Sequence, residues 1–185
     1  MKKFHLVTER SQVVLLQPGL APFLTDYIIR NRDHLGPWEP PRREEYFTLK
    51  NTQQTIAAKL KLYDQDLALP LVALDRSSQK VIATVNVSNI VRGIFQAAHL
   101  GYGVDEKYQG QGFMTEILSA AIPEIFTQLK LHRLMANYIP TNQRSGALLQ
   151  RLGFDKEGIA KDYLFINDQW HNHILTAKIN PDFHF

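Results

Sequence analysis

The chain of 185 residues contains no cysteine. A disulfide framework, a thiolate metal site and an acyl-cysteine intermediate are therefore excluded. If this protein transfers acyl groups, the transfer has to be direct or has to use another nucleophile.

The sequence also has no apolar run long enough to span a membrane, no internal repeat and no low-complexity tract. Its first residues, MKKFHLVTER, begin basic, but no apolar segment follows them, so we expect no signal peptide. At this length one domain with a substantial core is the simplest organisation. We therefore expect a single cytoplasmic domain, residues 1–185, without a membrane partner.

Positive charge is only slightly in excess, with a formal net charge of +3. A mildly basic surface suits an anionic cofactor or contact with an RNA-rich particle. Lysine and arginine are scattered rather than grouped in blocks, so an ordinary solvated surface is the simpler interpretation. We expect no DNA partner.

The stretch from residue 100 to 117, LGYGVDEKYQGQGFMTEI, organises the rest of the chain. Residues 100–104 alternate like a half-buried strand, a polar turn follows, and apolar residues recur every four positions from Phe113 onward, which predicts a helix to about Leu129. A strand that passes through a glycine turn into a helix directs free backbone N–H groups at one spot. Such a spot binds anions, most often phosphate.

The remaining pattern predicts helices that interleave with strands. Three strands in succession precede the glycine turn, which favours a mixed sheet over a purely parallel one. We expect an α/β (α+β) fold with a central sheet of six to seven strands flanked by about four helices. The expected strands are 13–17, 68–74, 81–88, 100–104, 133–138, 154–166 and 170–179, the expected helices are 20–30, 51–66, 113–129 and 142–152, and residues 34–47 are expected to be a loop.

Two common phosphate-binding motifs do not fit the glycine turn. A P-loop needs Lys followed by Ser or Thr after its last glycine, whereas Phe113 and Met114 stand there. A dinucleotide fingerprint needs a third glycine at Thr115 and an acidic residue about 20 positions later, where the chain is basic. Both alternatives fail.

The turn instead resembles the Q/R-x-x-G-x-G/A motif of the GCN5-related N-acetyltransferases (GNAT), which holds the pyrophosphate of acetyl-coenzyme A (acetyl-CoA). Met114 departs from the small last residue of that motif. Downstream, Asn142 and Ser145 followed by the residues LGF at 152–154 resemble the second half of the family pattern, N-x-x-S…LGF. The resemblance implies the GNAT fold, with the cosubstrate at the splayed strand–turn–helix.

Within this superfamily the chain resembles the RimJ/RimL ribosomal-protein N-acetyltransferases, and the RimJ type most closely. The stretches that carry the resemblance are 34–40 (HLGPWEP), 88–93 (SNIVRG), 100–102 (LGY), 135–140 (MANYIP) and 152–169 (LGFDKEGIAKDYLFINDQ). The resemblance implies direct acetyl transfer, in a ternary complex, from acetyl-CoA to the N-terminal alanine amine of a small-subunit ribosomal protein, free or on the ribosome.

The resemblance also implies which residues hold the cosubstrate. The glycine turn would hold the pyrophosphate, the strand before it would run beside pantetheine, and residues at the start of the helix 142–152 would hydrogen-bond pantetheine. The residues expected to bind the cosubstrate are Tyr102, Gly103, Val104, Gln109, Gly110, Gln111, Gly112, Phe113, Met114, Thr115, Asn142 and Ser145.

The catalytic groups are less completely implied. Some relatives that acetylate protein N-termini carry a glutamate base and a tyrosine acid at positions matching Asn137 and Leu149, which cannot transfer protons. RimL-type relatives have a serine at the place of Ser145, which we expect to protonate the departing CoA thiolate. Asp162 is the nearest carboxylate to the glutamate position of those relatives and is a candidate base.

The acceptor is expected to contact residues 34–47 and 89–92. Trp38 would wall a pocket for a small first residue, and Glu39, a second candidate base, would pair with the incoming ammonium, with Asn89 and Arg92 as further contacts. His171 and His173 share a strand face, but no third ligand accompanies them, so we expect no metal.

Two other functions stay open. Acetylation of a small amine or polyamine would require an acidic pocket and turnover with free amines. Because the glutamate and tyrosine of the relatives are missing, a non-catalytic module that binds acetyl-CoA or assists ribosome assembly is the alternative of a different class.

Overall fold

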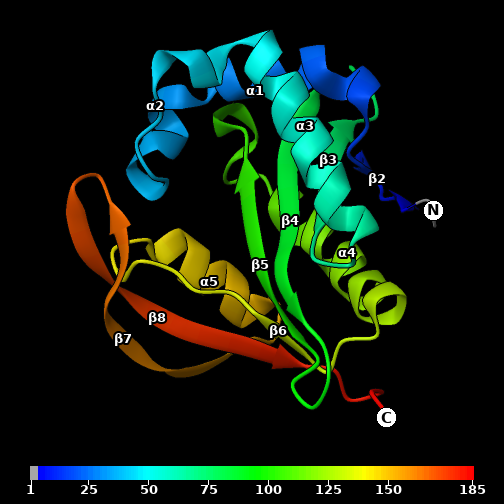
Figure 1. The fold of residues 1–185 in the computed structure, drawn as a ribbon, viewed down its shortest axis with the longest axis vertical. Coiled ribbons are helices and arrows are strands. Elements are labelled where there is room, and N and C mark those ends of the chain that lie inside the picture. Colours follow the sequence, from blue (N-terminus) through cyan, green and yellow to red (C-terminus); the bar gives the residue numbers. More distant parts are fainter. Residues whose placement is uncertain (1–3) are drawn as a thin grey trace.

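A computed structural model describes residues 4–185, which form one eight-stranded sheet with helices on both faces (Figure 1). The expected basic N-terminus lies in part in residues 1–3, outside the described residues. The strands are β1 (His5–Val7), β2 (Ser11–Leu15), β3 (Leu69–Asp75), β4 (Val81–Val91), β5 (Ala97–Val104), β6 (Arg133–Met135), β7 (Asp155–Ile166) and β8 (Gln169–Ile179).

The described residues also form five α-helices and four short 3₁₀ helices. The α-helices are α1 (Ala21–Arg30), α2 (Arg32–Leu35), α3 (Leu49–Asp64), α4 (Phe113–Leu129) and α5 (Gln143–Arg151), and the 3₁₀ helices are η1 (Pro18–Leu20), η2 (Gly36–Trp38), η3 (Glu44–Phe47) and η4 (Glu106–Tyr108). No helix within residues 4–185 is both long and apolar enough to cross a membrane.

The sheet order is β1-β2-β3-β4-β5-β6-β8-β7, and every neighbouring pair is antiparallel except β5 and β6. The expected mixed sheet is therefore confirmed. The sheet has one strand more than expected because β1, only three residues long, extends the edge beside β2. So short a run carries too little alternation to be recognised from sequence.

Two local expectations were wrong. Residues 34–47 are not an irregular loop, because α2, η2 and η3 occupy much of the segment. Short 3₁₀ turns have no periodicity to detect, although Pro37 near the start of η2 is compatible with one. The second correction concerns the helix expected at 51–66, for which Thr52 or Asn51 is a plausible cap from the sequence. Helix α3 begins at Leu49 instead and is capped by Thr48, whose hydroxyl accepts from the Asn51 N–H at 3.2 Å.

Two apolar clusters hold the helices on the sheet. The larger one packs α4 and α5 against one face, with Ile117, Ala121 and Ile125 of α4 fully buried. The smaller one packs α1 and α3 against the other face, through Leu24 and Ile56. Burial of whole Ile or Leu side chains stabilises a fold by roughly 1.5–3 kcal/mol each. Both faces of the central strands are therefore covered.

The sheet opens between β5 and β6. Only residues 97–99 of β5 pair with β6, so residues 100–104 have a partner on the β4 side alone. The strand then leads through η4 and the glycine turn into α4, the span predicted from sequence. In Figure 1, β5 and β8 lie close together at the lower end of the sheet and diverge toward the other end. This splay gives one strand a free backbone edge in the middle of a sheet.

Candidate active site

A cleft of about 970 Å³ lies at the splay. It is bounded by the open half of β5, the glycine turn, the first turn of α4, one side of α5 from its first to its last residue, and the segment around η2. Its walls bring together most of the residues predicted to bind the cosubstrate or the acceptor. Those in the lining are Trp38, Glu39, Tyr102, Gly103, Val104, Gln109, Gly110, Gly112, Phe113, Met114, Thr115, Asn142 and Ser145.

The glycine turn depends on two residues with left-handed backbone. Gly110 and Gly112 have φ values of 68° and 79°, a region that glycine enters without steric cost. Gly112 is the N-cap of α4, and the first helical hydrogen bond runs from the Glu116 N–H to the Gly112 carbonyl at 3.0 Å. The four N–H groups of residues 112–115 are therefore unused within the helix and point out of its N-terminus. This geometry suits an anionic group such as a diphosphate.

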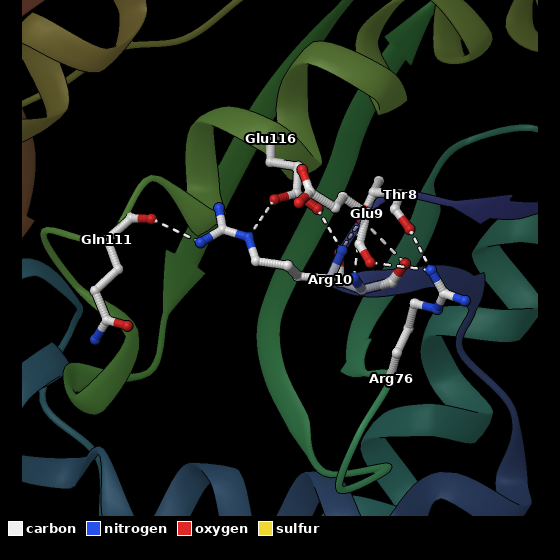
Figure 2. A network of polar contacts seen from close by, with 7 residues as sticks. Thr8, Glu9, Arg10, Arg76, Gln111 and Glu116 are labelled. Carbon is white, nitrogen blue, oxygen red and sulfur yellow. Dashed lines mark hydrogen bonds and ion pairs between the residues drawn. The ribbon is translucent and has the colours of Figure 1, made fainter.

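Arg10, in the turn between β1 and β2, fixes this helix start (Figure 2). Its guanidinium donates to the Gln111 carbonyl at 2.9 Å and to the Glu116 carboxylate at 2.6 Å, and its carbon lies 3.9 Å from the centre of the Phe113 ring. Burial alone would raise the pKa of Glu116, but bonds from Thr8 and Arg10 lower it overall. Glu116 lies in the first turn of α4, where its negative charge would repel an anionic ligand. The ion pair with Arg10 compensates that charge.

The open edge of β5 presents backbone groups to the cleft. In an antiparallel pair, opposed residues alternate between those that exchange backbone hydrogen bonds and those that do not. Because the Asp105 N–H donates to the Ile82 carbonyl at 2.8 Å, Gly103 also faces β4, whereas Tyr102 and Val104 direct their N–H and C=O groups away from β4. These groups can pair with an extended ligand as a neighbouring strand would.

The hydroxyl groups of Tyr102 and Ser145 lie 2.7 Å apart within the cleft. Burial raises the pKa of Tyr102 to about 12, and the bond to Ser145 opposes that rise. Tyr102 is therefore a neutral hydroxyl at physiological pH that can both donate and accept. Such a pair of linked hydroxyl groups can relay a proton within the cleft.

Asn142 begins α5 and orients Ser145. Its side-chain oxygen accepts from the Ser145 N–H at 3.1 Å, so the amide group caps the helix. The side-chain NH₂ of Asn142 is left to face the cleft as a donor. One residue thus shapes the helix start and offers a hydrogen bond to the ligand.

A second cavity, of about 420 Å³, lies across β5 from the cleft, between α1, η2, η3 and β4. Leu35 and Glu39 line both spaces. The cleft and the second cavity approach each other at Gly103, which has no side chain. A Cβ at this position would lie 3.2 Å from the Tyr27 hydroxyl and 3.5 Å from the Leu35 side chain. The Tyr27 hydroxyl is buried and has no hydrogen-bond partner among the described residues.

The floor of the second cavity is polar. The Lys59 ammonium donates to the Asn86 side-chain oxygen at 2.8 Å, and burial lowers the pKa of Lys59. Asn86 and Thr84 of β4 line the cavity beside Tyr27. This cavity can hold an acceptor whose amine reaches the open edge of β5.

Some predicted site residues lie outside the cleft. Arg92 pairs with Asp66 at 2.5 Å and donates to the Leu129 carbonyl, and Asn89 lies in the bulged far end of β4. Arg92 follows the end of β4, and the five residues of strand from Asn86, which lines the second cavity described above, to Val91 span about 17 Å. Their positions do not support the expected acceptor contacts.

Asp162 does not join the site either. It is exposed in a bulge of β7, where its N–H donates to the Asn172 side chain at 2.9 Å. Gln111 belongs to the glycine turn but not to the cleft wall, since its side chain bonds the Lys107 carbonyl. A base role for Asp162 therefore has no support from geometry.

The two positions that hold proton-transfer groups in some relatives have structural roles here. Leu149 is 1% exposed and part of the larger apolar cluster. Asn137 donates to the Tyr163 hydroxyl at 3.2 Å and accepts from the Thr176 N–H. The structure instead supplies a tyrosine hydroxyl from β5.

Sequence reasoning missed several side chains that line the cleft. The sequence predicts a role for the Tyr102 backbone alone, whereas the Tyr102 side chain also reaches α5 and bonds Ser145. Arg144 was not predicted as a site residue, and His34 was predicted only as part of the acceptor segment 34–47, yet the two bond opposite ends of the Gln109 amide at 2.6 and 2.8 Å. Arg144 and Arg151 are seven residues apart in a predicted helix, a spacing that places them on one face and was a usable signal.

The fold and the cleft define the class of protein. Residues 20–155 match the family model described as "Acetyltransferase (GNAT) domain", so the chain belongs to the GNAT family of acetyltransferases. The segment from β5 through the glycine turn into α4 lies at the splay, as the sequence resemblance implied.

The individual relatives sharpen this result. The [ribosomal protein uS5]-alanine N-acetyltransferase of Escherichia coli is 44% identical over 180 residues, which cover 97% of this chain and 93% of that protein. The crystal structure of the ribosomal-protein-S5-alanine acetyltransferase from Vibrio fischeri is 42% identical, with a TM-score of 0.94, and covers 98% of this chain and 100% of that one. RimJ from Mycobacterium smegmatis, solved with CoA-disulfide, is 24% identical with a TM-score of 0.87 over 96% of this chain and 86% of that one, and supports the fold.

Proposed function

We propose that this protein acetylates the N-terminal alanine of ribosomal protein uS5 in the cytoplasm, with acetyl-CoA as donor. The observation that carries the proposal is the 44% identity, over nearly the whole of both chains, to the E. coli enzyme that acts on this alanine. The relative named as acting on an N-terminal serine, the E. coli ribosomal-protein-serine acetyltransferase, is 26% identical over 70% of this chain. Alanine is accordingly the favoured first residue.

The residues of the cleft fit an acetyl-CoA donor. The free N–H groups of residues 112–115 suit the diphosphate, and the open edge of β5 suits the amides of the pantetheine arm. The Asn142 NH₂ adds a donor on the opposite wall. Acetyl-CoA supplies an activated acyl group, and the protein holds that group beside Val104.

Attack by the acceptor nitrogen needs a neutral amine. An α-amino group has a pKa of about 7.7–8, so a substantial fraction is neutral near pH 7, whereas a lysine amine with a pKa near 10.4 is almost all charged. Glu39 lines both cavities and lies where an ammonium would enter. It attracts the charged acceptor, and solvent at the mouth can accept the proton.

Two groups assist the transfer itself. The Val104 N–H faces the open edge of β5 and donates to the acyl oxygen as negative charge develops there. Ser145 donates a proton to the departing sulfur and takes one from the Tyr102 hydroxyl, which is in turn reprotonated from solvent. Because a thiol has a pKa of about 8.5, this protonation contributes modestly at neutral pH.

The acceptor enters through the second cavity. At about 420 Å³ it is within the usual range for ligand pockets and has room for the first residue of a peptide. Trp38, 38% exposed, lines the neighbouring cleft. The preference for alanine rests on the 44% identity to the E. coli enzyme.

The test is incubation of the protein and acetyl-CoA with a peptide of the first ten residues of uS5, read by mass spectrometry. The expected product is one acetyl group at the alanine nitrogen. Matched controls are the same peptide with its α-amine blocked, and free spermidine. Acetylation of spermidine but not of the peptide would favour the small-amine function. Bound acetyl-CoA with no acetylated peptide or intact small subunit would favour a non-catalytic module.

A further inference from the structure

Two arginines of α5 reach the two ends of the glycine turn. The Arg144 guanidinium donates to the side-chain oxygen of Gln109 at 2.6 Å, and that of Arg151 donates to the Thr115 hydroxyl at 3.3 Å. Both arginines line the cleft. Seven residues, almost two helical turns, separate them, so they project from the same face of α5.

Neither cation has a carboxylate partner among the described residues. Most other described arginines pair with an acidic side chain, namely Arg10, Arg30, Arg32, Arg42, Arg92 and Arg133. Arg144 and Arg151 instead contact neutral oxygens, which leave their charge uncompensated. Two unpaired cations that converge on a helix N-terminus make a strongly anion-selective wall.

The negative groups nearby are neutralised or distant. Glu116, in the first turn of α4, is paired with Arg10, and the buried Asp105 is paired with Arg30. Glu39 lies at the acceptor end of the same cleft. The cleft is therefore positive where the phosphates of a donor would lie, and the Glu39 carboxylate at its other end is paired with Arg42 at 3.5 Å.

We propose that Arg144 and Arg151 form the α5 half of the phosphate site, with Arg144 on the donor's diphosphate and Arg151 on its 3′-phosphate. This inference rests on the proposed use of acetyl-CoA. The order follows from the acyl end of the cleft, which Ser145 and Tyr102 mark. Arg151 lies six residues beyond Ser145, about 9 Å further along the helix.

Binding of the donor exchanges one set of partners for another. The amide oxygen of Gln109 and the hydroxyl of Thr115 are released, and charged phosphate oxygens take their place. Bonds between guanidinium and phosphate are shorter and roughly twice as strong as bonds to neutral acceptors, and they can be bidentate. The unliganded contacts thus hold both side chains near their bound positions.

Calorimetric titration of acetyl-CoA and of 3′-dephospho-acetyl-CoA tests the assignment. The wild type is expected to bind acetyl-CoA more tightly. Arg151→Met is expected to remove this preference by weakening acetyl-CoA about 10- to 100-fold while leaving the dephospho donor unchanged. Arg144→Met is expected to weaken both donors by a similar factor and to keep the preference.

Three controls keep the result interpretable. Lys156→Met removes a cation on exposed β7 and is expected to change neither affinity. Arg151→Lys retains charge without the planar fork and is expected to restore part of the preference. Thermal unfolding checks that each variant is folded. A wild-type preference retained in Arg151→Met, or unchanged affinities in Arg144→Met, would overturn the assignment.

The same titration separates this inference from the proposed function. Donor affinities that respond to the arginines as expected, together with no acetylation of any uS5 peptide, support the phosphate site and overturn the acceptor assignment. No binding of acetyl-CoA by the wild-type protein overturns both.

Discussion

Tyr102 and Ser145 join their hydroxyl groups at 2.7 Å, although one lies on β5 and the other on α5. Asn142 orients the serine by capping its helix, and burial keeps the tyrosine protonated. The contact closes the acyl end of the cleft between a strand edge and a helix start. We propose these two hydroxyl groups as the proton-transfer pair, since the position that holds a tyrosine in some relatives is Leu149 here.

Removing either hydroxyl should slow catalysis without loosening the donor. Ser145→Ala and Tyr102→Phe are each expected to lower kcat about 10- to 100-fold, at the lower end of the range for positioned proton donors, because the departing thiolate is only weakly basic. The measurements are steady-state kinetics with the uS5 peptide and the Kd of acetyl-CoA, which should stay within twofold.

The double variant tests whether the two hydroxyls act as one unit. If they do, Tyr102→Phe combined with Ser145→Ala is expected to be no slower than the slower single variant. Losses of kcat that multiply would show independent roles, and an unchanged kcat in Ser145→Ala would remove the serine from the mechanism.

Gly103→Ala should obstruct the acceptor. The added methyl would lie 3.2 Å from the Tyr27 hydroxyl and 3.5 Å from Leu35, where the two cavities meet. We expect KM for the peptide to rise about tenfold, with the Kd of acetyl-CoA little changed. Gly101→Ala is the matched control, since its methyl meets only the Asn86 carbonyl at 4.0 Å. Equal effects of the two variants would contradict the assignment of the second cavity.

Gly110→Ala should disturb the donor turn through backbone conformation alone. No atom lies within 4 Å of the added methyl, but the φ of 68° costs an L-residue about 1–2 kcal/mol. We expect weaker binding of acetyl-CoA and a lower free energy of unfolding. Gly158→Ala, also in open space but without positive φ, should leave both quantities unchanged. Calorimetric titration and urea unfolding provide the comparison.

Glu39→Gln should weaken capture of the charged acceptor. Glu39 is partly exposed, and its carboxylate lies 3.5 Å from the Arg42 guanidinium. Because solvent-exposed ion pairs have small energies, we expect the KM for the peptide to rise only about two- to fivefold. Glu45→Gln, nearby but exposed outside both cavities, serves as control. The effect should shrink at high salt. An identical KM at low salt would exclude Glu39 from acceptor binding.

Acid should destabilise the fold partly through Asp75. The pKa of Asp75 is lowered to about 2, chiefly by the Ser77 hydroxyl, and the Tyr108 hydroxyl adds to the effect at 2.8 Å. A carboxylate whose folded pKa lies below its unfolded value stabilises the protein above the unfolded pKa. That stability is lost as the pH falls from about 4 to about 2.

The comparison is chemical unfolding of the wild type and Asp75→Asn between pH 2 and pH 7. The variant is expected to be less stable at pH 7 and to lose less stability between pH 4 and pH 2. Parallel curves over that interval would rule out Asp75 as a source of the acid sensitivity.

The sequence predicted the parts of this fold that have long periodic patterns. The helix 113–129 and the strands expected at 154–166 and 170–179 form close to where they were predicted, and the two strands pair as a hairpin with Asn167 and Asp168 at positive φ in its turn. Local chemistry specifies these elements, since apolar spacing marks the helix and turn-forming residues mark the hairpin. By contrast, β1 and the short helices within residues 34–47 depend on tertiary contacts that no local pattern records.

The site was predictable where it is made from one continuous stretch. Gly110 and Gly112 define the donor turn within a few residues of chain. The expected roles of Arg92 and Asp162 rested on neighbouring motifs, and the fold places both away from the cleft. The bond between Tyr102 and Ser145 joins residues 43 positions apart, and only the packing of α5 against β5 creates it.

The open edge of β5 has a consequence for how such proteins diversify. It offers main-chain groups, which every substitution except proline leaves in place. Mutations in the walls around Tyr27 and Trp38 can therefore change which amine is accepted, while the main-chain groups proposed to bind the acetyl donor stay the same. Proteins with this strand can therefore change acceptor specificity by single substitutions, without an intermediate that no longer binds the donor.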